Sequence, residues 1–271
     1  YNFAFQKRFG QNFLIDGHVV EKIISSADIT RDDIVLEIGP GIGTMTQYLA
    51  EAAREVVAVE IDTKLIPILQ DTLKEYDNVT VLNEDILKVD LHKLIKEEKN
   101  ENIKNVKIVA NLPYYITTPI IMKLLEENLD IESITVMIQK EVADRLIEIP
   151  SGKNTGAITY TVFYYCEPEK IREVENTCFI PMPEVTSEVI NLKLRKEPAV
   201  KVKDKKVFFN IIKSAFMQRR KTLLNALTNA QVFISKQEGI KILNKLGLNE
   251  NVRAENLTIE NYADLAKEIS K

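Results

Sequence analysis

Cysteine and histidine are scarce in this sequence, and their scarcity excludes several kinds of site. The 271 residues include two cysteines, Cys166 and Cys178, and two histidines, His18 and His92. The cysteines form no CxxC pair and the four side chains are widely spaced, which argues against a structural zinc site. We therefore expect no metal, and we interpret the cysteines as reduced thiols of a cytoplasmic protein.

Long hydrophobic runs, internal repeats and low-complexity segments are also lacking. The longest uncharged run, residues 108–122, has 15 residues and is interrupted by Asn111, Pro113 and Pro119. Such a run is too short and too broken to cross a membrane, so we expect no membrane association. The hydrophobic fraction of 45% and the charged fraction of 28% are typical of a globular chain and exclude whole-chain disorder.

Positive charge is concentrated in one stretch of the chain. Residues 193–221 carry eleven Lys or Arg and two acidic residues, whereas residues 1–192 carry 19 basic and 32 acidic residues. A basic stretch beside an acidic body favours a polyanionic partner held on one face. The alternative is a solvated linker and helix face.

The chain from Asp33 to about Leu194 alternates between short apolar runs and helical patterns. Continuous Val and Ile runs between helices are typical of a doubly wound, Rossmann-like α/β fold with a parallel sheet. A later pair of more alternating strands, 170–174 and 189–194, predicts an antiparallel edge. The predicted strands are 34–38, 56–59, 79–82, 106–110 and 134–138, and the predicted helices are 44–53, capped by Thr44, 63–74 and 117–126.

The character of the sequence changes after Leu194. Residues 196–206 are charged and contain a proline, which is typical of a linker, and apolar residues from Val207 onward fall at helical spacing. Gly239 and Gly247 punctuate two further helical stretches. We therefore predict a catalytic domain over residues 1–196 and a small all-helical domain over residues 197–271, because 271 residues is near the limit for one core.

A glycine-rich loop, Glu37-Ile38-Gly39-Pro40-Gly41-Ile42-Gly43, follows the first predicted strand. Its third glycine comes one residue too early for the dinucleotide pattern, and Glu37 is unlike that pattern. Glu60, at the end of the next strand, offers two acceptors for ribose hydroxyls, and Asp85 can accept from an adenine amine. These features predict an S-adenosylmethionine (AdoMet) site; the alternative is that they are turn and cap residues.

A second motif, Asn111-Leu112-Pro113-Tyr114, follows the fourth predicted strand. It suits methylation of a planar exocyclic amine, whose lone pair is delocalised into its ring. The Asn111 side-chain oxygen and the Leu112 carbonyl can bind the two N–H groups, Pro113 fixes the loop, and Tyr114 offers a ring for a base taken out of its stack. The alternative is an ordinary turn at a strand end.

Together these motifs resemble those of the small-subunit ribosomal RNA adenine dimethyltransferases, over nearly the whole chain. Residues 5–14 are similar to the family segment that folds over AdoMet, and residues 111–119 are similar to its catalytic motif. Residues 179–183 resemble a late loop whose aromatic ring packs against the target base, which implies that role for Phe179. Taken alone, Phe179 is better interpreted as a core residue.

The resemblance completes the set of predicted site residues. Asn12 and Leu14 join the cofactor contacts on this basis. The predicted catalytic residues are Asn111, Leu112, Pro113, Tyr114 and Phe179, and the predicted cofactor-binding residues are Asn12, Leu14, Gly39, Gly41, Glu60, Ile61, Asp85 and Asn111.

Two C-terminal segments, residues 215–227 and 253–257, resemble signatures of the small-subunit branch and separate it from the large-subunit adenine methyltransferases of antibiotic resistance. Two features depart from the family pattern. Glu184 stands where the family usually has a lysine, and Ala157–Tyr160 is an uncommon version of its segment. Both bear on RNA contacts and neither touches the predicted chemistry.

The resemblance implies transfer of two methyl groups to each of two adjacent adenines in the 3′-terminal hairpin of small-subunit (16S) rRNA. The implied partner is an immature small ribosomal subunit, and the chain is expected to act as a monomer. Alternatives are a large-subunit rRNA methyltransferase of the resistance type, an RNA-binding assembly factor, and a DNA amine methyltransferase.

The RNA is expected to contact cationic faces rather than the acidic body. The candidates are Arg219, Arg220 and Lys221 near the start of the helical domain, and Lys7 and Arg8 at the other end of the chain. On a helix, three consecutive residues cannot share one face. One member of the 219–221 cluster is therefore free to pair with an acidic residue instead.

Overall fold

The computed structural model describes residues 12–98, 105–152 and 154–270, which form two compact units. The first unit contains the described residues up to Ala143 together with Pro168–Leu194, and the second contains Asp144–Glu167 together with the residues from Arg195 onward. This division does not coincide with a single boundary after residue 196. Residues 144–167 join the second unit because Tyr160 and Tyr164 are buried in its core.

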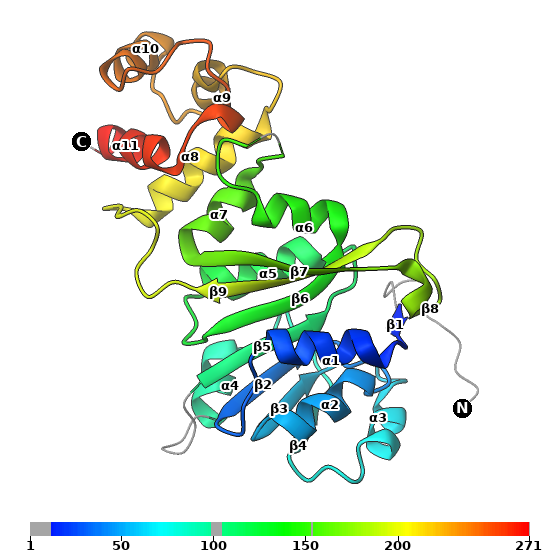
Figure 1. The fold of residues 1–271 in the computed structure, drawn as a ribbon. Coiled ribbons are helices and arrows are strands. Elements are labelled where there is room, and N and C mark those ends of the chain that lie inside the picture. The colour runs from blue at the N-terminus through cyan, green and yellow to red at the C-terminus, as the bar shows by residue number, and fades with distance from the viewer. Residues whose placement is uncertain (1–11, 99–104, 153, 271) are drawn as a thin grey trace. The chain divides into compact units, whose positions relative to one another are not determined.

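The first unit is built on a mainly parallel sheet, seen in Figure 1. Its strand order is β4-β3-β2-β5-β6-β9-β7; the pairs from β4 to β6 are parallel, and β9 is antiparallel to β6. A separate ribbon pairs β1 with β8. The strands are β1 (Phe13–Leu14), β2 (Asp33–Ile38), β3 (Glu55–Val59), β4 (Val79–Leu82), β5 (Asn105–Asn111), β6 (Ser133–Gln139), β7 (Cys166–Val174), β8 (Phe179–Ile180) and β9 (Ser187–Leu194).

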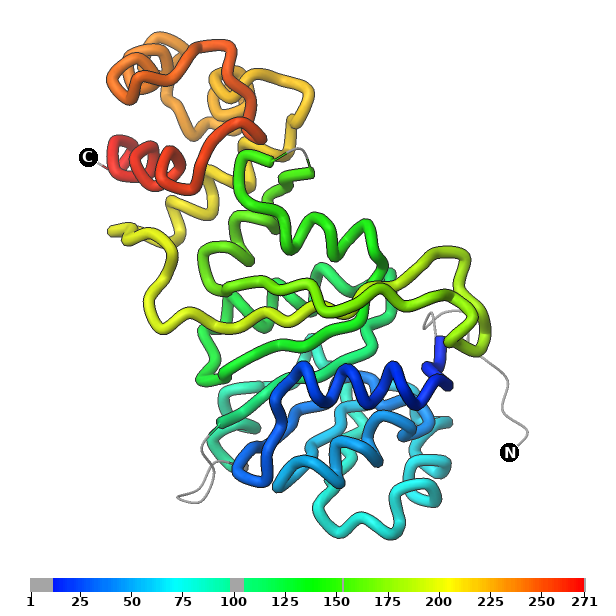
Figure 2. The backbone as a smooth tube through the Cα atoms, in the orientation of Figure 1, coloured from blue at the N-terminus to red at the C-terminus, as the bar shows by residue number. Residues whose placement is uncertain are grey.

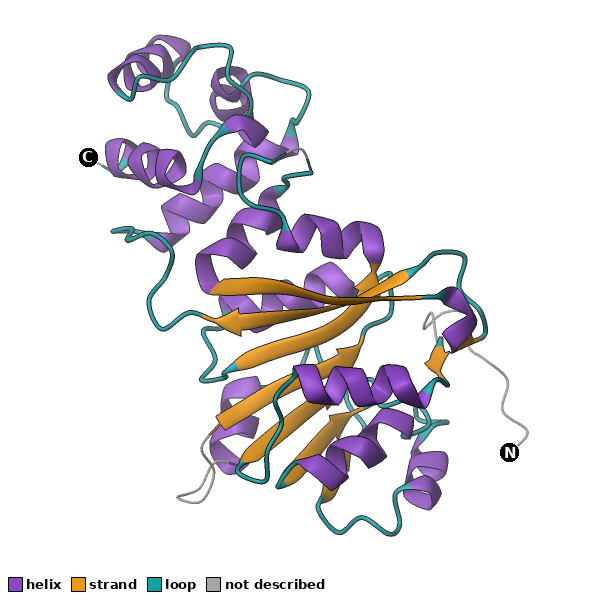
Figure 3. Cartoon of the chain, in the orientation of Figure 1, coloured by secondary structure: helices purple, strands orange, loops and turns teal. Residues whose placement is uncertain are grey.

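Helices cover both faces of this sheet, as Figure 3 shows. On one face, Val35 and Val109 share a core with Val20 of α1 and Leu49 of α2. On the other face, Ile34 and its neighbours lie against α4. The helices that begin in this unit are α1 (Gly17–Ser26), α2 (Thr44–Ala52), α3 (Ile66–Thr72), α4 (Leu91–Glu98), α5 (Thr117–Glu126) and α6 (Lys140–Ile147), and a 3₁₀ turn, η2, spans Asn176–Cys178.

The predicted α/β fold is confirmed, because apolar strands buried on both faces need a helical layer on each side. The five central strands lie within a residue or two of their predicted ranges, and the antiparallel edge is present. Two local predictions were wrong. Gly43, not Thr44, is the N-cap of α2, and α3 begins at Ile66 rather than at Thr63.

The second unit is helical and has its own hydrophobic core. Tyr160 of α7, Phe208 of α8 and Tyr262 of α11 are among its fully buried side chains. Gly239 lies inside α10 rather than at its end. A Cβ there would lie 2.6 Å from side-chain atoms of Leu224 and Phe233, so close packing requires glycine at this position. Its helices are α7 (Ala157–Tyr165), α8 (Lys205–Met217), α9 (Leu223–Asn229), α10 (Lys236–Lys245) and α11 (Ile259–Ile269), with a 3₁₀ turn, η3, at Ala254–Asn256.

The path of the chain through both units can be followed in Figure 2. The predicted linker corresponds to the irregular segment between β9 and α8, and Asp204 ends it by accepting hydrogen bonds from the backbone N–H groups of Lys206 and Val207. In the described part of the chain, no helix is both long and apolar enough to cross a bilayer.

Candidate functional site

A pocket lies at the carboxyl ends of the parallel strands in the first unit. It is lined by the loops that follow β2 and β5, the end of β3, the turn after β4, and residues of β1. The chain runs outward from β2 through β3 to β4 and then returns to β5. The strand order therefore reverses between β2 and β5, and open α/β sheets bind ligands at such a reversal.

The glycine-rich loop forms one wall of this pocket. Gly39, Gly41 and Gly43 all have positive φ angles, of 71°, 63° and 90°. A Cβ at Gly41 would lie 2.8 Å from the ring of Phe13, which strand β1 brings over the loop. Glycine is therefore required at Gly41 both by backbone conformation and by space, because the Phe13 ring occupies the place of a side chain. A Cβ at Gly39 would have only the Asn111 carbonyl oxygen near it, at 3.9 Å, so a ligand can approach the backbone closely there.

Glu60 lies beside this loop at the end of β3 and is 4% exposed. Its Oε2 accepts a hydrogen bond from the Gly41 N–H at 3.2 Å, and its Oε1 accepts one from the Asp62 N–H at 2.8 Å. Burial raises the pKa of this carboxyl. Each oxygen is oriented by one backbone donor and keeps a further lone pair for a ligand hydroxyl.

Asp85 lies on the same side of the pocket, just after β4. Its carboxylate accepts a hydrogen bond from the Leu87 N–H at 3.1 Å, and the Lys88 ammonium lies 3.7 Å away. Ile61 also lines the pocket and is partly exposed. The two side chains provide an acceptor and an apolar surface beside Glu60, which suits a purine ring with an exocyclic amine.

Glu37 is the most unusual side chain in the pocket wall. It is the last but one residue of strand β2, just before the glycines, is 0% exposed, and neither carboxyl oxygen has a hydrogen-bond partner among the described residues. Burial, with a smaller contribution from the nearby charge of Glu60, raises its pKa to about 8. A buried acceptor without a partner is costly, so this carboxyl favours a ligand that carries positive charge.

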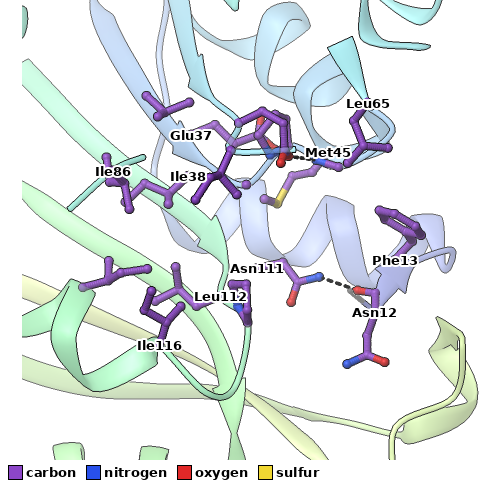
Figure 4. Close-up of a pocket in the computed structure, with 18 of the residues that line it drawn as sticks. Asn12, Phe13, Glu37, Ile38, Met45, Leu65, Ile86, Asn111, Leu112 and Ile116 are labelled. Atoms are coloured by element: carbon purple, nitrogen blue, oxygen red, sulfur yellow. Dashed lines mark hydrogen bonds between the residues drawn. The ribbon is translucent and has the colours of Figure 1, made fainter. Parts of the chain in front are cut away.

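The second motif closes the opposite wall of the pocket, as Figure 4 shows. Asn111 is the last residue of β5, and its Nδ2 donates to the carbonyl of Asn12 at 3.0 Å. This hydrogen bond uses the amide nitrogen within the protein, so the Oδ1 atom remains as the acceptor for a ligand in the pocket. Sequence reasoning predicted both residues, but it gave no indication that Asn12 orients Asn111.

The residues after Asn111 form a tethered turn. The Leu112 N–H donates to the Met137 carbonyl at 3.1 Å, and the Pro113 carbonyl accepts from the Ile116 N–H at 3.2 Å. Tyr114 lines the pocket, is half-buried, and has a pKa raised chiefly by burial. The turn therefore holds Leu112, Pro113 and Tyr114 along one side of the pocket, next to Asn111.

The predicted cofactor residues lie together, with one difference at Leu14. All eight line the pocket, but Leu14 is also buried in the core beneath the ribbon. Phe13 also lines the pocket, although no motif predicted it. Its position between two predicted cofactor contacts, Asn12 and Leu14, could have indicated it.

Phe179 is the predicted catalytic residue that the structure does not bring to the pocket. It pairs with Leu14 in the β1–β8 ribbon, is 3% exposed, and belongs to the core shared with α1 and α2. Its ring is buried because neighbouring side chains of a ribbon alternate between faces. In this structure Phe179 has the core role that the sequence alone favoured.

The predicted RNA-binding residues lie outside the pocket. Arg219, Arg220 and Lys221 are exposed in the turn between α8 and α9, and none of the three forms an ion pair with another described residue. A helix was expected at this position, with one of the three residues on a different face from the others. Both expectations were wrong, because the three residues lie in a turn. Lys7 and Arg8 lie outside the described residues.

The pocket residues fit AdoMet. The fully buried carboxyl of Glu37 suits a cationic ligand, the oriented carboxylate of Glu60 suits a diol, and the open backbone at Gly39 admits close contact. A pyrophosphate would instead meet the acidic side chains of Glu37 and Glu60 and would oppose their ionisation. These observations agree with the AdoMet prediction and disfavour a dinucleotide.

Comparison with known proteins leads to the same conclusion. The family model described as ribosomal RNA adenine dimethylase matches residues 2–271. The ribosomal RNA small subunit methyltransferase A of Lachnoclostridium phytofermentans is 56% identical over 98% of this chain and 92% of its own length. That of Alkaliphilus metalliredigens is 52% identical over 100% of this chain and 93% of its own length.

Solved structures agree with these sequence relationships. A dimethyladenosine transferase from Plasmodium falciparum superposes with a TM-score of 0.79 at 25% identity, covering 95% of this chain and 97% of that one. The 23S rRNA methyltransferase ErmE gives a TM-score of 0.69 at 25% identity, covering 96% and 100%. The chain therefore belongs to the ribosomal RNA adenine dimethylase family and is an AdoMet-dependent rRNA adenine methyltransferase.

Proposed function

We propose that this enzyme dimethylates the exocyclic amines of two adjacent adenines in the 3′-terminal hairpin loop of small-subunit rRNA, within an immature small ribosomal subunit. The observation that carries the proposal is the orientation of Asn111, whose Nδ2 donates to the Asn12 carbonyl. An amide held in this way presents Oδ1, an acceptor, to a ligand amine. The names of the curated relatives, at 47% to 56% identity, support the small subunit as substrate.

The chemistry follows from what the two acceptors do to the target amine. Oδ1 of Asn111 and the carbonyl of Leu112 bind the two N–H groups of the unmodified amine, and one of these acceptors binds the single N–H that remains after the first transfer. Both arrangements favour a pyramidal nitrogen with a localised lone pair. Tyr114 provides a ring against which the extruded base stacks. AdoMet supplies the methyl group on a positively charged sulfur. Catalysis then rests on orientation and electrostatics rather than on a strong general base.

The cofactor is held by the opposite wall of the pocket. Glu60 would accept hydrogen bonds from the two ribose hydroxyls, Asp85 would accept one from the adenine amine, and Ile61 would pack against the purine. Glu37 would serve the positively charged part of the ligand, where ionisation of its carboxyl would balance that charge. The absence of a side chain at Gly39 allows this close approach.

RNA binding is assigned to the second unit. Arg219, Arg220 and Lys221 are exposed and are free of ion pairs with described residues, so their charges are available to phosphates. Arginine presents a planar fork that matches phosphate oxygens. The acidic composition of residues 1–192 makes such a local cationic surface necessary.

The test is methyl transfer from labelled AdoMet onto small subunits isolated from cells that lack the enzyme. We expect two dimethylated adenines, mapped by primer extension to the 3′-terminal hairpin. Large-subunit rRNA is the control substrate, and modification of that RNA alone would identify a resistance-type enzyme. Binding without any methyl transfer would instead leave an assembly factor.

A further inference from the structure

The phenol of Tyr114 is held by a residue that no sequence motif indicated. Its Oη lies 2.7 Å from Oγ of Ser187, which is 73 residues further along the chain. Ser187 is the first residue of β9, is 0% exposed, and is not among the residues that line the pocket. The contact therefore joins a side chain in the pocket wall to a buried anchor behind it.

Ser187 is held firmly by the surrounding sheet. It pairs with Gln139 in the β6–β9 ladder, and the carbonyl of the preceding residue, Thr186, accepts from the Lys140 N–H at 3.0 Å. The following residue, Glu188, is 0% exposed, and its carboxylate lies 2.5 Å from the Lys170 ammonium. Backbone pairing on one side and the ion pair of the buried Glu188 carboxylate with Lys170 on the other fix the position of the Ser187 hydroxyl.

The backbone of the catalytic turn has its own tethers, but these do not set the ring. The chain is held before Tyr114 by the Leu112 N–H, and after it by the Ile116 N–H and the Thr117 hydroxyl, which donate to the Pro113 carbonyl. The ring can still rotate about its two side-chain torsions. The hydrogen bond to Ser187 selects one orientation, and burial keeps the phenol protonated by raising its pKa, so a hydroxyl proton remains available for that bond.

We infer that Ser187 is a positioning residue: it fixes the ring of Tyr114 so that its face meets the target adenine in the orientation that methyl transfer needs. This inference rests on the proposed function, because it assigns the ring to the base. The role predicts an effect on turnover and none on AdoMet affinity, since Ser187 does not itself line the pocket and acts only through the ring of Tyr114.

The kinetic test is a double-mutant cycle with Ser187→Ala and Tyr114→Phe. Each single variant leaves one buried or half-buried hydroxyl without its partner, whereas the double variant removes both. We expect each single variant to lower kcat about threefold to tenfold with unchanged Kd for AdoMet. The kcat of the double variant should be no lower than that of the less active single variant. Independent, multiplying losses would overturn the inference.

The matched control is Ser133→Ala, which removes the same group from the opposite end of the β6–β9 pair. We expect wild-type kcat for it. If Ser187→Ala fails to melt cooperatively, Tyr114→Phe removes the same hydrogen bond from the accessible side. An unchanged kcat in folded Tyr114→Phe would then overturn the inference.

A second readout does not depend on the RNA substrate. In protein with isotope-labelled tyrosine, the ring signal of Tyr114 is identified by its loss in Tyr114→Phe. The chemical shift of this signal should change in Ser187→Ala and stay the same in Ser133→Ala. An unmoved signal overturns the positioning role. If the signal moves but the wild-type enzyme does not methylate small subunits, the proposed function is overturned. The hydrogen bond between Ser187 and Tyr114 is then still supported.

Discussion

The two units hold their functional side chains in different ways. In the first unit, Glu60 and Asn111 lie at strand ends and are oriented by backbone groups; Glu60 is buried and Asn111 is half-buried. In the second unit, Arg219 and Arg220 extend from an exposed turn and have no ion-pair partner among the described residues. Recognition of a small polar ligand requires acceptors fixed in place, whereas a polyanion requires accessible charge.

This difference has a physical basis. Fixed dipoles in a water-poor pocket act strongly on a ligand because little solvent screens them. Exposed charges are screened by salt and act mainly through the release of counterions from the nucleic acid. Substitutions in the first unit should therefore change turnover or cofactor affinity by large factors, and substitutions in the turn should change salt dependence.

The largest effect is expected at Asn111. Asn111→Ala removes an acceptor aimed at the target amine, and we expect kcat to fall by about 100-fold or more. The measurement is methyl transfer to small subunits, with AdoMet affinity determined separately by calorimetry. Asn191→Ala is the matched control, because Asn191 lies in the same sheet and donates to the Ser26 carbonyl. Near-normal turnover of Asn111→Ala would remove this residue from the mechanism.

The next effect is expected at Glu60. Glu60→Ala removes the oriented carboxylate and should weaken AdoMet binding by roughly 1.5–3 kcal/mol, the range for hydrogen bonds to a charged group. Isothermal calorimetry on the free enzyme measures this without RNA. Glu51→Ala, on the exposed surface of α2, controls for loss of one acidic side chain. Unchanged affinity in Glu60→Ala would contradict the assignment of the diol to this carboxylate.

A smaller effect is expected from the buried carboxyl of Glu37. Its pKa is about 8 in the folded protein, against an ordinary value of 4.5. Between these values the folded state binds more protons than the unfolded state, so the free energy of unfolding falls as pH rises. Glu37→Gln removes this dependence.

We therefore expect the stability of Glu37→Gln, relative to wild type, to rise by about 1 kcal/mol between pH 6 and pH 7. Urea unfolding at each pH measures it in the absence of AdoMet. With AdoMet present, wild type should release protons on binding, which calorimetry in buffers of different ionisation enthalpy detects. A stability difference that does not vary with pH would show that Glu37 is already ionised.

The smallest effect is expected in the exposed turn. Arg219→Ala combined with Arg220→Ala should flatten the plot of log affinity for small subunits against log salt by about one to two units. AdoMet affinity should stay unchanged, because these residues are absent from the pocket lining. Lys236→Ala with Lys241→Ala removes the same charge from α10 and should change the slope less. An unchanged slope in a folded Arg219 and Arg220 double variant would contradict the RNA-binding role and show that this turn is only a solvated surface.

Local pattern alone determined much of this protein. Continuous Val and Ile runs specify strands buried on both faces, and glycines that must adopt positive φ specify the loop after β2. Because parallel strands end at one edge, the spacing of Glu60, Asp85 and Asn111 was enough to predict that they share a pocket.

Contacts between distant segments were decided only by the tertiary structure. The orientation of Asn111 depends on a carbonyl 99 residues away, and that of Tyr114 depends on a hydroxyl 73 residues away. Burial of Phe179 follows from its pairing with Leu14, and residues 144–167 join the helical unit because Tyr160 and Tyr164 complete its core. Sequence periodicity reports which face of an element is apolar, but not which distant element covers that face. For the same reason the raised pKa of Glu37 was hidden: it arises from complete desolvation, which only the packed sheet and helices around it produce.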